Sequence, residues 1–497
     1  MRNRLAVGVI CLAAAMSVAL PRPEAFAGRL AGIGSVGVTG IQVQNLDPAQ
    51  GATIVIDLYP QDCGAPVSIN LPSTAVGAAA NIYLPAQSEM RNGIFAAIIS
   101  SDRNVAALAR TDWNATGGAA LYSHSQIGHE LTVPLVMRDY VGQTSLVTVH
   151  NTDVNAPADV LAELYPMGSS TPAYSTRLEI CKGTSKTIDL GEADLGTVFP
   201  LGFLGAMRLT SASPISAQAF VDIATSAKAV YAFEALPIEA AAETLYAPLI
   251  RAHQQGTGTD KLDTGIAVAN PSDQAVDVTV TYRGSSGSCT GLARTHGPIT
   301  IGARASHVFY QGPGGESGLP ANCVGSAVVS APGGKVVAIV NDAVNQTQLS
   351  AAYNAMSAAD AGLEVALPLF RRAVAGLTSG IMVMNVGTER ANAAITFLDL
   401  RGTPIVGCGA QCSVQLEPNA SASWWPGAIQ SIGDGAYGSA VITSDQPVIA
   451  IANDYPVRGG VDAAIYNGIT ADAPPSQPGQ PTPAPDIRSV PFVYKGG

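Results

Sequence analysis

Two stretches of the sequence carry residue types that could support cofactor or metal chemistry. Residues 32–37 match the pattern G-x-G-x-x-G, which binds a dinucleotide where it follows a strand and opens a helix. No strand pattern precedes these glycines and β-type sequence follows them, so we interpret them as part of a flexible N-terminal arm. His124, His129 and Glu130 could be metal ligands, but they lack the H-E-x-x-H spacing. Neither stretch predicts a cofactor or metal site.

Four aspartates stand at the ends of apolar strand patterns, and a tyrosine follows each of them 9 to 12 residues later. Carboxylates at repeated positions could bind calcium between domains, yet the sequence has no dense D-x-D-x-D loop. Because catalysis rarely needs four copies of one carboxylate, we favour a turn or a structural hydrogen bond and keep calcium as the alternative. The aspartates are Asp112, Asp222, Asp342 and Asp454, and the tyrosines are Tyr122, Tyr231, Tyr353 and Tyr466.

A longer sequence motif, which we call the Pro-Leu phrase, recurs in the same units as these aspartates and tyrosines. It consists of an apolar residue, Pro-Leu and an arginine, and it leads into an apolar strand that ends in asparagine. The phrase occurs at 133–138, 247–251 and 367–371. The asparagines are spaced 106, 119 and 115 residues apart, and each interval suits one β-sandwich of about 100 residues. An asparagine before a turn can cap nearby backbone groups, which is our interpretation here. The four are Asn45, Asn151, Asn270 and Asn385.

Composition and alternation predict an all-β chain. It holds 52 Gly and 33 Pro with 13% charged residues, a profile of short strands and turns. We predict four tandem Ig-like antiparallel β-sandwich domains in a rod, then a Pro-rich linker and a C-terminal strand. Proline cannot donate to a sheet ladder, so the Pro-Leu phrase fits a leading edge strand. The expected domains are 28–132, 133–246, 247–366 and 367–472, the linker is 473–488, and the strand is 489–497.

The tandem units resemble the Ig-like β-sandwich repeats of bacterial secreted and cell-surface proteins. The resemblance covers residues 28–472 and rests on repeat length, strand alternation and the short markers. A secreted or surface location is also expected from residues 1–27, which read as a signal peptide with Arg2 and Arg4, an apolar run and a small-x-small cleavage site. No apolar run reaches the roughly 20 residues of a membrane span, so membrane insertion is not expected. A net charge of −11 without a Lys/Arg cluster disfavours nucleic acid as a partner.

Six cysteines remain beyond the signal peptide. Cys289 and Cys323 fall in one unit, and Cys408 and Cys412 fall close together in another, so we predict two local disulfides in an exported protein. Cys63 and Cys181 stand alone in their units. They either bridge a domain or subunit boundary or stay as buried thiols.

The first unit lacks the Pro-Leu phrase, and a spare phrase follows the last unit. A sandwich without an edge strand exposes unpaired backbone groups that invite another strand. We therefore predict that the C-terminal strand of one chain inserts into domain 1 of the next, which resembles the way some pilus subunits join, although those subunits usually donate an N-terminal strand. Such a contact can propagate as an open fibre. The predicted polymerisation strand is Val490, Pro491, Phe492, Val493 and Tyr494, and the acceptor is Gly40, Ile41, Val43 and Asn45.

This hypothesis makes the protein a secreted structural subunit of an extracellular filament or surface assembly, with itself as principal partner. Three alternatives stay open for the tail: it folds back on its own chain, residues 28–40 fill the gap, or the tail is disordered. The alternative function is a monomeric cell-surface adhesin or ligand-binding rod for other surface proteins or glycans. No enzymatic activity and no cofactor are expected, because the sequence lacks a P-loop, a G-x-S-x-G elbow and a zinc-protease motif.

Overall fold

The computed structural model describes residues 37–113, 118–192, 200–223, 230–255, 261–344, 350–405, 408–456, 463–470 and 486–495. Across these residues the chain is all-β: strands and short 3-10 turns occur, and no α-helix. No helix that could cross a membrane occurs in the described ranges. The predicted signal peptide and residues 473–485 of the predicted linker lie outside them.

The strands fall into four repeats in chain order. Repeat 1 contains β1 (Val38–Asn45), β2 (Ile54–Pro60), β3 (Val67–Asn70), β4 (Ala79–Tyr83), β5 (Gly93–Ser101), β6 (Val105–Trp113) and β7 (Gly118–Ser123). Repeat 2 contains β8 (Gly128–Arg138), β9 (Gln143–Asn151), β10 (Ala158–Pro166), β11 (Tyr174–Ile180), β12 (Ser185–Asp189), β13 (Phe203–Ile223), β14 (Val230–Glu234) and β15 (Leu236–Pro237).

The second half repeats the order. Repeat 3 contains β16 (Thr244–Ala252), β17 (Gln254–Gln255), β18 (Lys261–Ala269), β19 (Val276–Gly287), β20 (Ala293–Ile301), β21 (Ser306–Tyr310), β22 (Cys323–Ser330), β23 (Val337–Val344) and β24 (Ser350–Asn354). Repeat 4 contains β25 (Gly362–Arg371), β26 (Leu377–Asn385), β27 (Ala391–Asp399), β28 (Ser413–Leu416), β29 (Ser421–Trp424), β30 (Tyr437–Pro456), β31 (Ala464–Asn467) and β32 (Ile469–Thr470). The last strand, β33 (Asp486–Lys495), stands apart in sequence.

Each repeat builds an outer and an inner layer of antiparallel strands. In repeat 3 the layers are separate sheets: β16, β22, β19 and β20 form one, and β17, β18, β21, β23 and β24 form the other. In repeats 2 and 4 one long strand, β13 or β30, pairs with strands of both layers. The outer strands alternate buried and exposed residues, as in β10 and β19, because one face covers the core and the other meets solvent.

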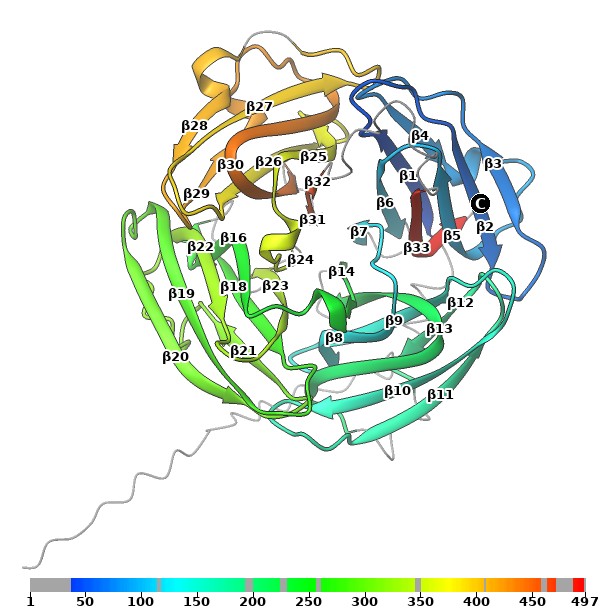
Figure 1. Cartoon of the computed structure of the whole chain (residues 1–497), viewed down its shortest axis with the longest axis horizontal. Coiled ribbons are helices and arrows are strands. Elements are labelled where there is room, and N and C mark those ends of the chain that lie inside the picture. Colours follow the sequence, from blue (N-terminus) through cyan, green and yellow to red (C-terminus); the bar gives the residue numbers. More distant parts are fainter. Residues whose placement is uncertain are drawn as a thin grey trace, which may run out of the picture.

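The four repeats form a ring, so the predicted rod is wrong. The short strands β7, β14, β24 and β31 surround the centre, and each contacts the next, with β31 returning to β7 (Figure 1). The physical reason lies in the inner layers, whose strands are buried on both faces; β26, for example, is buried at every position. A sheet with two apolar faces must be covered twice. In a rod, the second face would meet water.

Each core accordingly extends into the following repeat. Buried side chains of repeat 3 join the core of repeat 2, and the same relation holds from repeat to repeat around the ring. The shared residues are Ala267, Ile339 and Ala352 in the core of repeat 2, Met382, Met384, Ile449, Ile451, Ala463 and Ile465 in that of repeat 3, Leu108 and Leu121 in that of repeat 4, and Leu146, Phe220, Val230 and Ala232 in that of repeat 1.

Polar side chains at the ends of the central strands tie neighbouring repeats together. The Asn467 side-chain amide donates to the Asn354 carbonyl at 2.7 Å and accepts from the Asn354 N–H at 3.1 Å. Asn354 makes the same pair of contacts to the Glu234 backbone at 3.4 and 3.3 Å. The Glu234 carboxyl group accepts from the Ser123 hydroxyl, and its burial raises the pKa of Glu234 to about 7. These contacts link four repeats at the centre.

The ring predicts a compact particle in solution. A compact chain of this length has a radius of gyration of about 23 Å, whereas four domains end to end would give roughly 40 Å. Small-angle X-ray scattering of the monomeric fraction should therefore give a value near the lower figure. A value near the upper figure would restore the rod.

Candidate functional site: the groove that holds the C-terminal strand

The C-terminal strand β33 lies inside repeat 1 of its own chain. It pairs antiparallel with β5, from Asp486 opposite Ser101 to Lys495 opposite Gly93. It meets β1 at one pair, Val38 with Lys495. Figure 1 shows β33 beside β5 and β1. The strand begins at Asp486, so the last three residues of the predicted linker belong to it.

The main edge of the groove is β5, which sequence reasoning missed. The predicted acceptor residues lie in β1, where Gly40, Ile41 and Val43 pair with β6 on one side and β4 on the other. Ile41 and Val43 join β33 in one apolar core rather than in a ladder. The signal for β5 is its apolar run from Ile94 to Ile99, which places it beneath another strand.

We call a strand that carries a Pro-Leu phrase, or the related phrase of β33, a leading strand. In each leading strand described below, the ladder of hydrogen bonds is interrupted at the proline. The ladder of β33 is interrupted between Val490 and Val493, around Pro491. The ladders of β16 and β25 are interrupted around Pro248 and Pro368, between Ala247 and Ile250 and between Leu367 and Phe370. Proline has no N–H to donate, so it fits where the ladder is already broken. β33 therefore has the local geometry of a leading strand.

The repeated tyrosines hold this irregularity. The Tyr122 hydroxyl donates to the carbonyl oxygen of Phe492, the residue after the proline, at 2.6 Å. Tyr353 does the same to Leu249 at 2.6 Å, and Tyr466 donates to Leu369. Burial raises the pKa of Tyr122, so the phenol stays protonated and can donate. Tyr231 differs, because its hydroxyl donates to the Gln143 side chain at 3.0 Å.

Apolar side chains supply most of the attraction between β33 and its groove. Val490, Phe492, Val493 and Tyr494 are all buried. The Phe492 ring packs 5.1 Å from the ring of Phe220, which belongs to repeat 2. Full burial of such side chains contributes about 1.5–3 kcal/mol each. The strand thus stabilises repeat 1 and its contact with repeat 2 together.

Polar contacts fix both ends of β33. At the C-terminal end the Lys495 ammonium donates to the carbonyl oxygens of Gln87, at 2.6 Å, and Met90. At the N-terminal end the Asp486 carboxylate accepts from the Val105 N–H at 2.9 Å. Arg488 forms an ion pair with Asp486 at 2.9 Å. A shift of register would break the contacts that Lys495 and Asp486 make with the groove.

The middle of β33 inserts one hydroxyl into repeat 2. The Ser489 Oγ lies 2.7 Å from His150 Nδ1 and 2.6 Å from Ser216 Oγ. The other ring nitrogen of His150, Nε2, lies 3.0 Å from the Gly183 carbonyl oxygen. All of these polar atoms belong to buried residues. The contact holds the strand against both repeats.

Five further residues from the sequence analysis are engaged in structural contacts. Asp342 pairs with Arg251 of the leading phrase, and Asp454 pairs with Arg371 at 3.0 Å. Asp112 pairs with Arg110 at 2.6 Å. Glu130 binds Arg208 at 2.7 Å, and His124 lies 2.9 Å from Arg488. In the described ranges no three His, Cys, Asp or Glu side chains are placed to hold a metal ion.

The four asparagines join two loops each, which confirms the capping interpretation and extends it. In repeat 1 the Asn45 side chain accepts from the Asp47 N–H at 3.0 Å and donates to the carbonyl oxygens of Gln50 and Thr74 at 2.8 and 3.0 Å. Asn151, Asn270 and Asn385 make equivalent contacts, again with backbone groups about 30 residues away. The asparagine thus ties the turn after its own strand to a distant loop.

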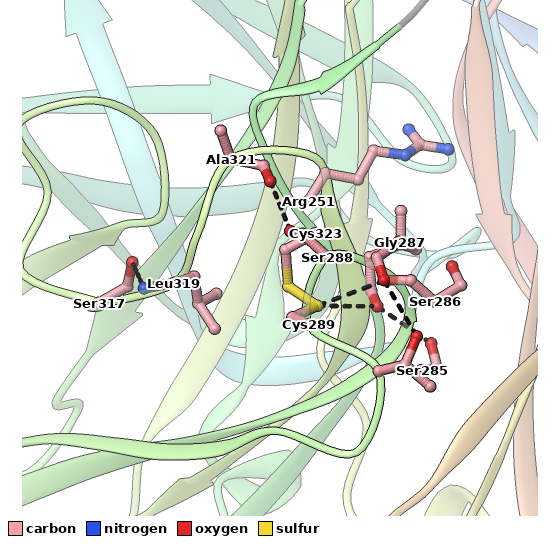
Figure 2. The surroundings of a disulfide bond; sticks show 12 residues. Arg251, Ser285, Ser286, Gly287, Ser288, Cys289, Ser317, Leu319, Ala321 and Cys323 are labelled. Atoms are coloured by element: carbon pink, nitrogen blue, oxygen red, sulfur yellow. Dashed lines mark hydrogen bonds between the residues drawn. A yellow bond between two sulfur atoms is a disulfide. The ribbon is translucent and has the colours of Figure 1, made fainter.

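The described part of the chain contains three disulfides. Cys289–Cys323 and Cys408–Cys412 join the pairs expected from their spacing. Figure 2 shows the first of them beside the serine-rich end of β19 and the turn that follows it. Cys63–Cys181 links repeat 1 to repeat 2, which settles the pairing that the sequence left open.

Comparison with known proteins gives little further guidance. No protein-family model matches the chain, and no curated protein matches it. Solved structures with some likeness include Thermotoga maritima 1070, with 20% identity over 22% of this chain and 92% of its own and a TM-score of 0.18. They also include the tetra-tandem repeat of a large adhesion protein, with 13% identity, 88% and 95% coverage and a TM-score of 0.11. Latent PorU from Porphyromonas gingivalis has 8% identity, 73% and 31% coverage and a TM-score of 0.14. At such TM-scores these likenesses carry no argument.

Removing one hydroxyl should loosen β33. In Tyr122→Phe the buried Phe492 carbonyl oxygen loses its donor, and an unsatisfied buried group costs about 1–3 kcal/mol. Amide hydrogen exchange within residues 486–495 should therefore accelerate at least fivefold. The matched control is Tyr353→Phe, which removes the same contact from β16 and should leave β33 unchanged. Equal exchange of β33 in both variants would mean that Tyr122 does not hold the strand.

Proposed function

We propose that the protein is a secreted structural subunit of an extracellular filament or surface assembly, in which β33 of one chain occupies repeat 1 of another. The observation that carries this proposal is the position of β33. It has the bulge, the tyrosine contact and the apolar face of a leading strand, yet it follows the fourth repeat in sequence. The acceptor and the donor are therefore separate pieces of the chain.

The pairing within one chain and a pairing between chains use the same contacts. A strand from a second chain would present the same side chains to β5, Tyr122 and His150, so exchange between chains follows the logic of domain swapping. Only 15 residues separate Thr470 from Asp486, and a short connection gives an effective concentration in the millimolar range. In dilute solution β33 should therefore bind repeat 1 of its own chain. Where the concentration of chains is high before this contact forms, β33 should bind repeat 1 of another chain.

The proposal includes an Ig-like fold for each repeat and a secreted location for the protein. We interpret each repeat as an Ig-like sandwich of an outer and an inner sheet. Three disulfides support an oxidising compartment, where secreted proteins fold. A structural role without catalysis agrees with carboxylates that are paired with arginines, as Asp342 and Asp454 are.

Chains refolded at high concentration should join through β33. We expect the full-length chain, unfolded and refolded at about millimolar concentration, to give a ladder of oligomers in size-exclusion chromatography with light scattering. Phe492→Asp places a charge in the apolar groove and should abolish the ladder. Ile487→Asp is the matched control, because Ile487 is on the same strand and 50% exposed. Oligomers that persist in Phe492→Asp would contradict the proposed function.

A second candidate function, binding of glycans or surface proteins by the closed ring, is favoured by exposed aromatic residues. Tyr83 and Tyr310 occupy the same register position, opposite Gly40 and Gly265, and Trp425 follows the equivalent strand of repeat 4. Their exposed fractions are 54%, 36% and 39%. Flat aromatic faces with a polar edge suit ligands that are partly apolar and partly wet, such as sugars.

This second candidate has a direct test. The triple variant Tyr83→Ala, Tyr310→Ala and Trp425→Ala should lose binding to any glycan that the wild-type protein retains on an array, by tenfold or more. Its fold should survive, because the three side chains are partly exposed. Undiminished binding by the triple variant, or no binding by the wild type, would remove this candidate.

A further inference from the structure

Two consecutive residues of β33 each contact a histidine, and the two histidines belong to different repeats. The first contact joins Arg488 Nη1 and His124 Nε2 at 2.9 Å. A guanidinium group can only donate, so His124 Nε2 must accept and carries no proton. His124 follows β7 in repeat 1. In the docked strand its ring is therefore neutral.

The second contact is compatible with a neutral ring at His150. The Gly183 carbonyl oxygen can only accept, so the nitrogen 3.0 Å from it, Nε2, carries the proton. The other nitrogen, Nδ1, then accepts a hydrogen bond from the Ser489 hydroxyl at 2.7 Å. Ser216 completes the chain by donating to Ser489 at 2.6 Å. This arrangement suits the neutral imidazole, and burial opposes protonation of the ring, because the charged form would lose its hydration.

We propose that β33 is an acid-released strand: it stays in its groove while His124 and His150 are neutral and leaves when they take up protons. The inference rests on the proposed function and adds its regulation. It names the condition under which the strand becomes free to pass from one chain to another. A compartment at about pH 4.5 would favour the exchange of β33 between chains. A return to neutral pH would then stabilise each strand in the groove that it has entered.

The surroundings of the two rings explain the direction. The charged group that contacts His124 is Arg488, which forms an ion pair with Asp486 on the same strand. Burial, with a further contribution from Arg488, lowers the pKa of His124 to about 3. His150 faces hydroxyl and carbonyl groups from β33, β13 and the turn before β12, and burial lowers its pKa to about 4. A second positive charge beside Arg488 is unfavourable, and Arg488 departs with the strand.

The sign and size of the effect follow from linkage. A histidine exposed by release has an ordinary pKa near 6.5. Above that pH neither state is protonated, and docking does not depend on pH. Between pH 6.5 and the lowered values, the released state binds protons that the docked state excludes. Release then becomes about tenfold more favourable per pH unit for each histidine, up to about 100-fold each at pH 4.5.

Amide hydrogen exchange of the full chain tests this proposal. Protection factors, which correct for the intrinsic effect of pH, are measured for residues 486–495 at pH 7 and pH 4.5. We expect the protection of β33 to fall by 100-fold or more in acid. The leading strand β16, residues 244–252, reports on global unfolding and should keep its protection. A constant protection of β33, or an equal loss in β16, would overturn the proposal.

Two substitutions provide the decisive control. His124→Gln and His150→Asn each keep an acceptor for the donor on β33 but cannot titrate. Each should reduce the acid-induced loss of protection about tenfold or more, and the double variant should nearly abolish it. If the double variant does not fold, the single variants provide the test. An acid-induced loss of β33 protection as large in both single variants as in the wild type would mean that other groups cause the release. The loss of the oligomer ladder in Phe492→Asp at neutral pH is a separate measurement, so failure of this inference leaves the proposed function standing.

Discussion

The need to cover sheets that are apolar on both faces determines the architecture of this protein. The inner sheet of each repeat is covered on one side by its own outer layer and on the other by the leading strand of the preceding repeat. Contacts run from β8 to β18 and β23, from β16 to β26 and β30, from β25 to β1 and β6, and from β33 to β9 and β13. The same contact thus occurs at all four junctions between repeats, and together the four junctions close the ring. At the junction between repeats 1 and 2 the covering strand is β33.

Apolar and polar contacts have different roles in placing β33. Val490, Phe492 and Val493 supply burial, which is strong but would tolerate a shifted strand. The hydrogen bonds of Tyr122, Ser489 and Lys495 join particular atoms of the strand to particular atoms of the groove, so they specify one register. The polar contacts also make docking conditional, since a histidine that must accept a hydrogen bond cannot also be charged. The same residues therefore determine where the strand binds and when it can leave.

Much of the fold could be predicted from local patterns. Strand alternation and the pairs Cys289–Cys323 and Cys408–Cys412 are visible in sequence because each depends on residues of one repeat. The regular spacing of Asn45 and its counterparts is visible because the whole unit is repeated. The alternation of apolar and polar residues does not predict a ring. A different pattern does indicate it, because residues 381–384 are apolar at every position, which is typical of strands buried on both faces. The Ser489 and His150 contact joins residues 339 positions apart. No local pattern records such a contact.

The junction that can lose its strand is also the one with a covalent link. Cys63–Cys181 joins repeats 1 and 2, whereas the other two disulfides lie within repeats 3 and 4. Gln61 adds a hydrogen bond to Ser185 across the same boundary at 3.2 Å. When β33 leaves, apolar side chains such as Phe220 are exposed, and an unlinked junction could open or collapse. The disulfide keeps repeats 1 and 2 covalently joined beside the groove, so in the proposed exchange an incoming strand would meet two repeats that are still held together.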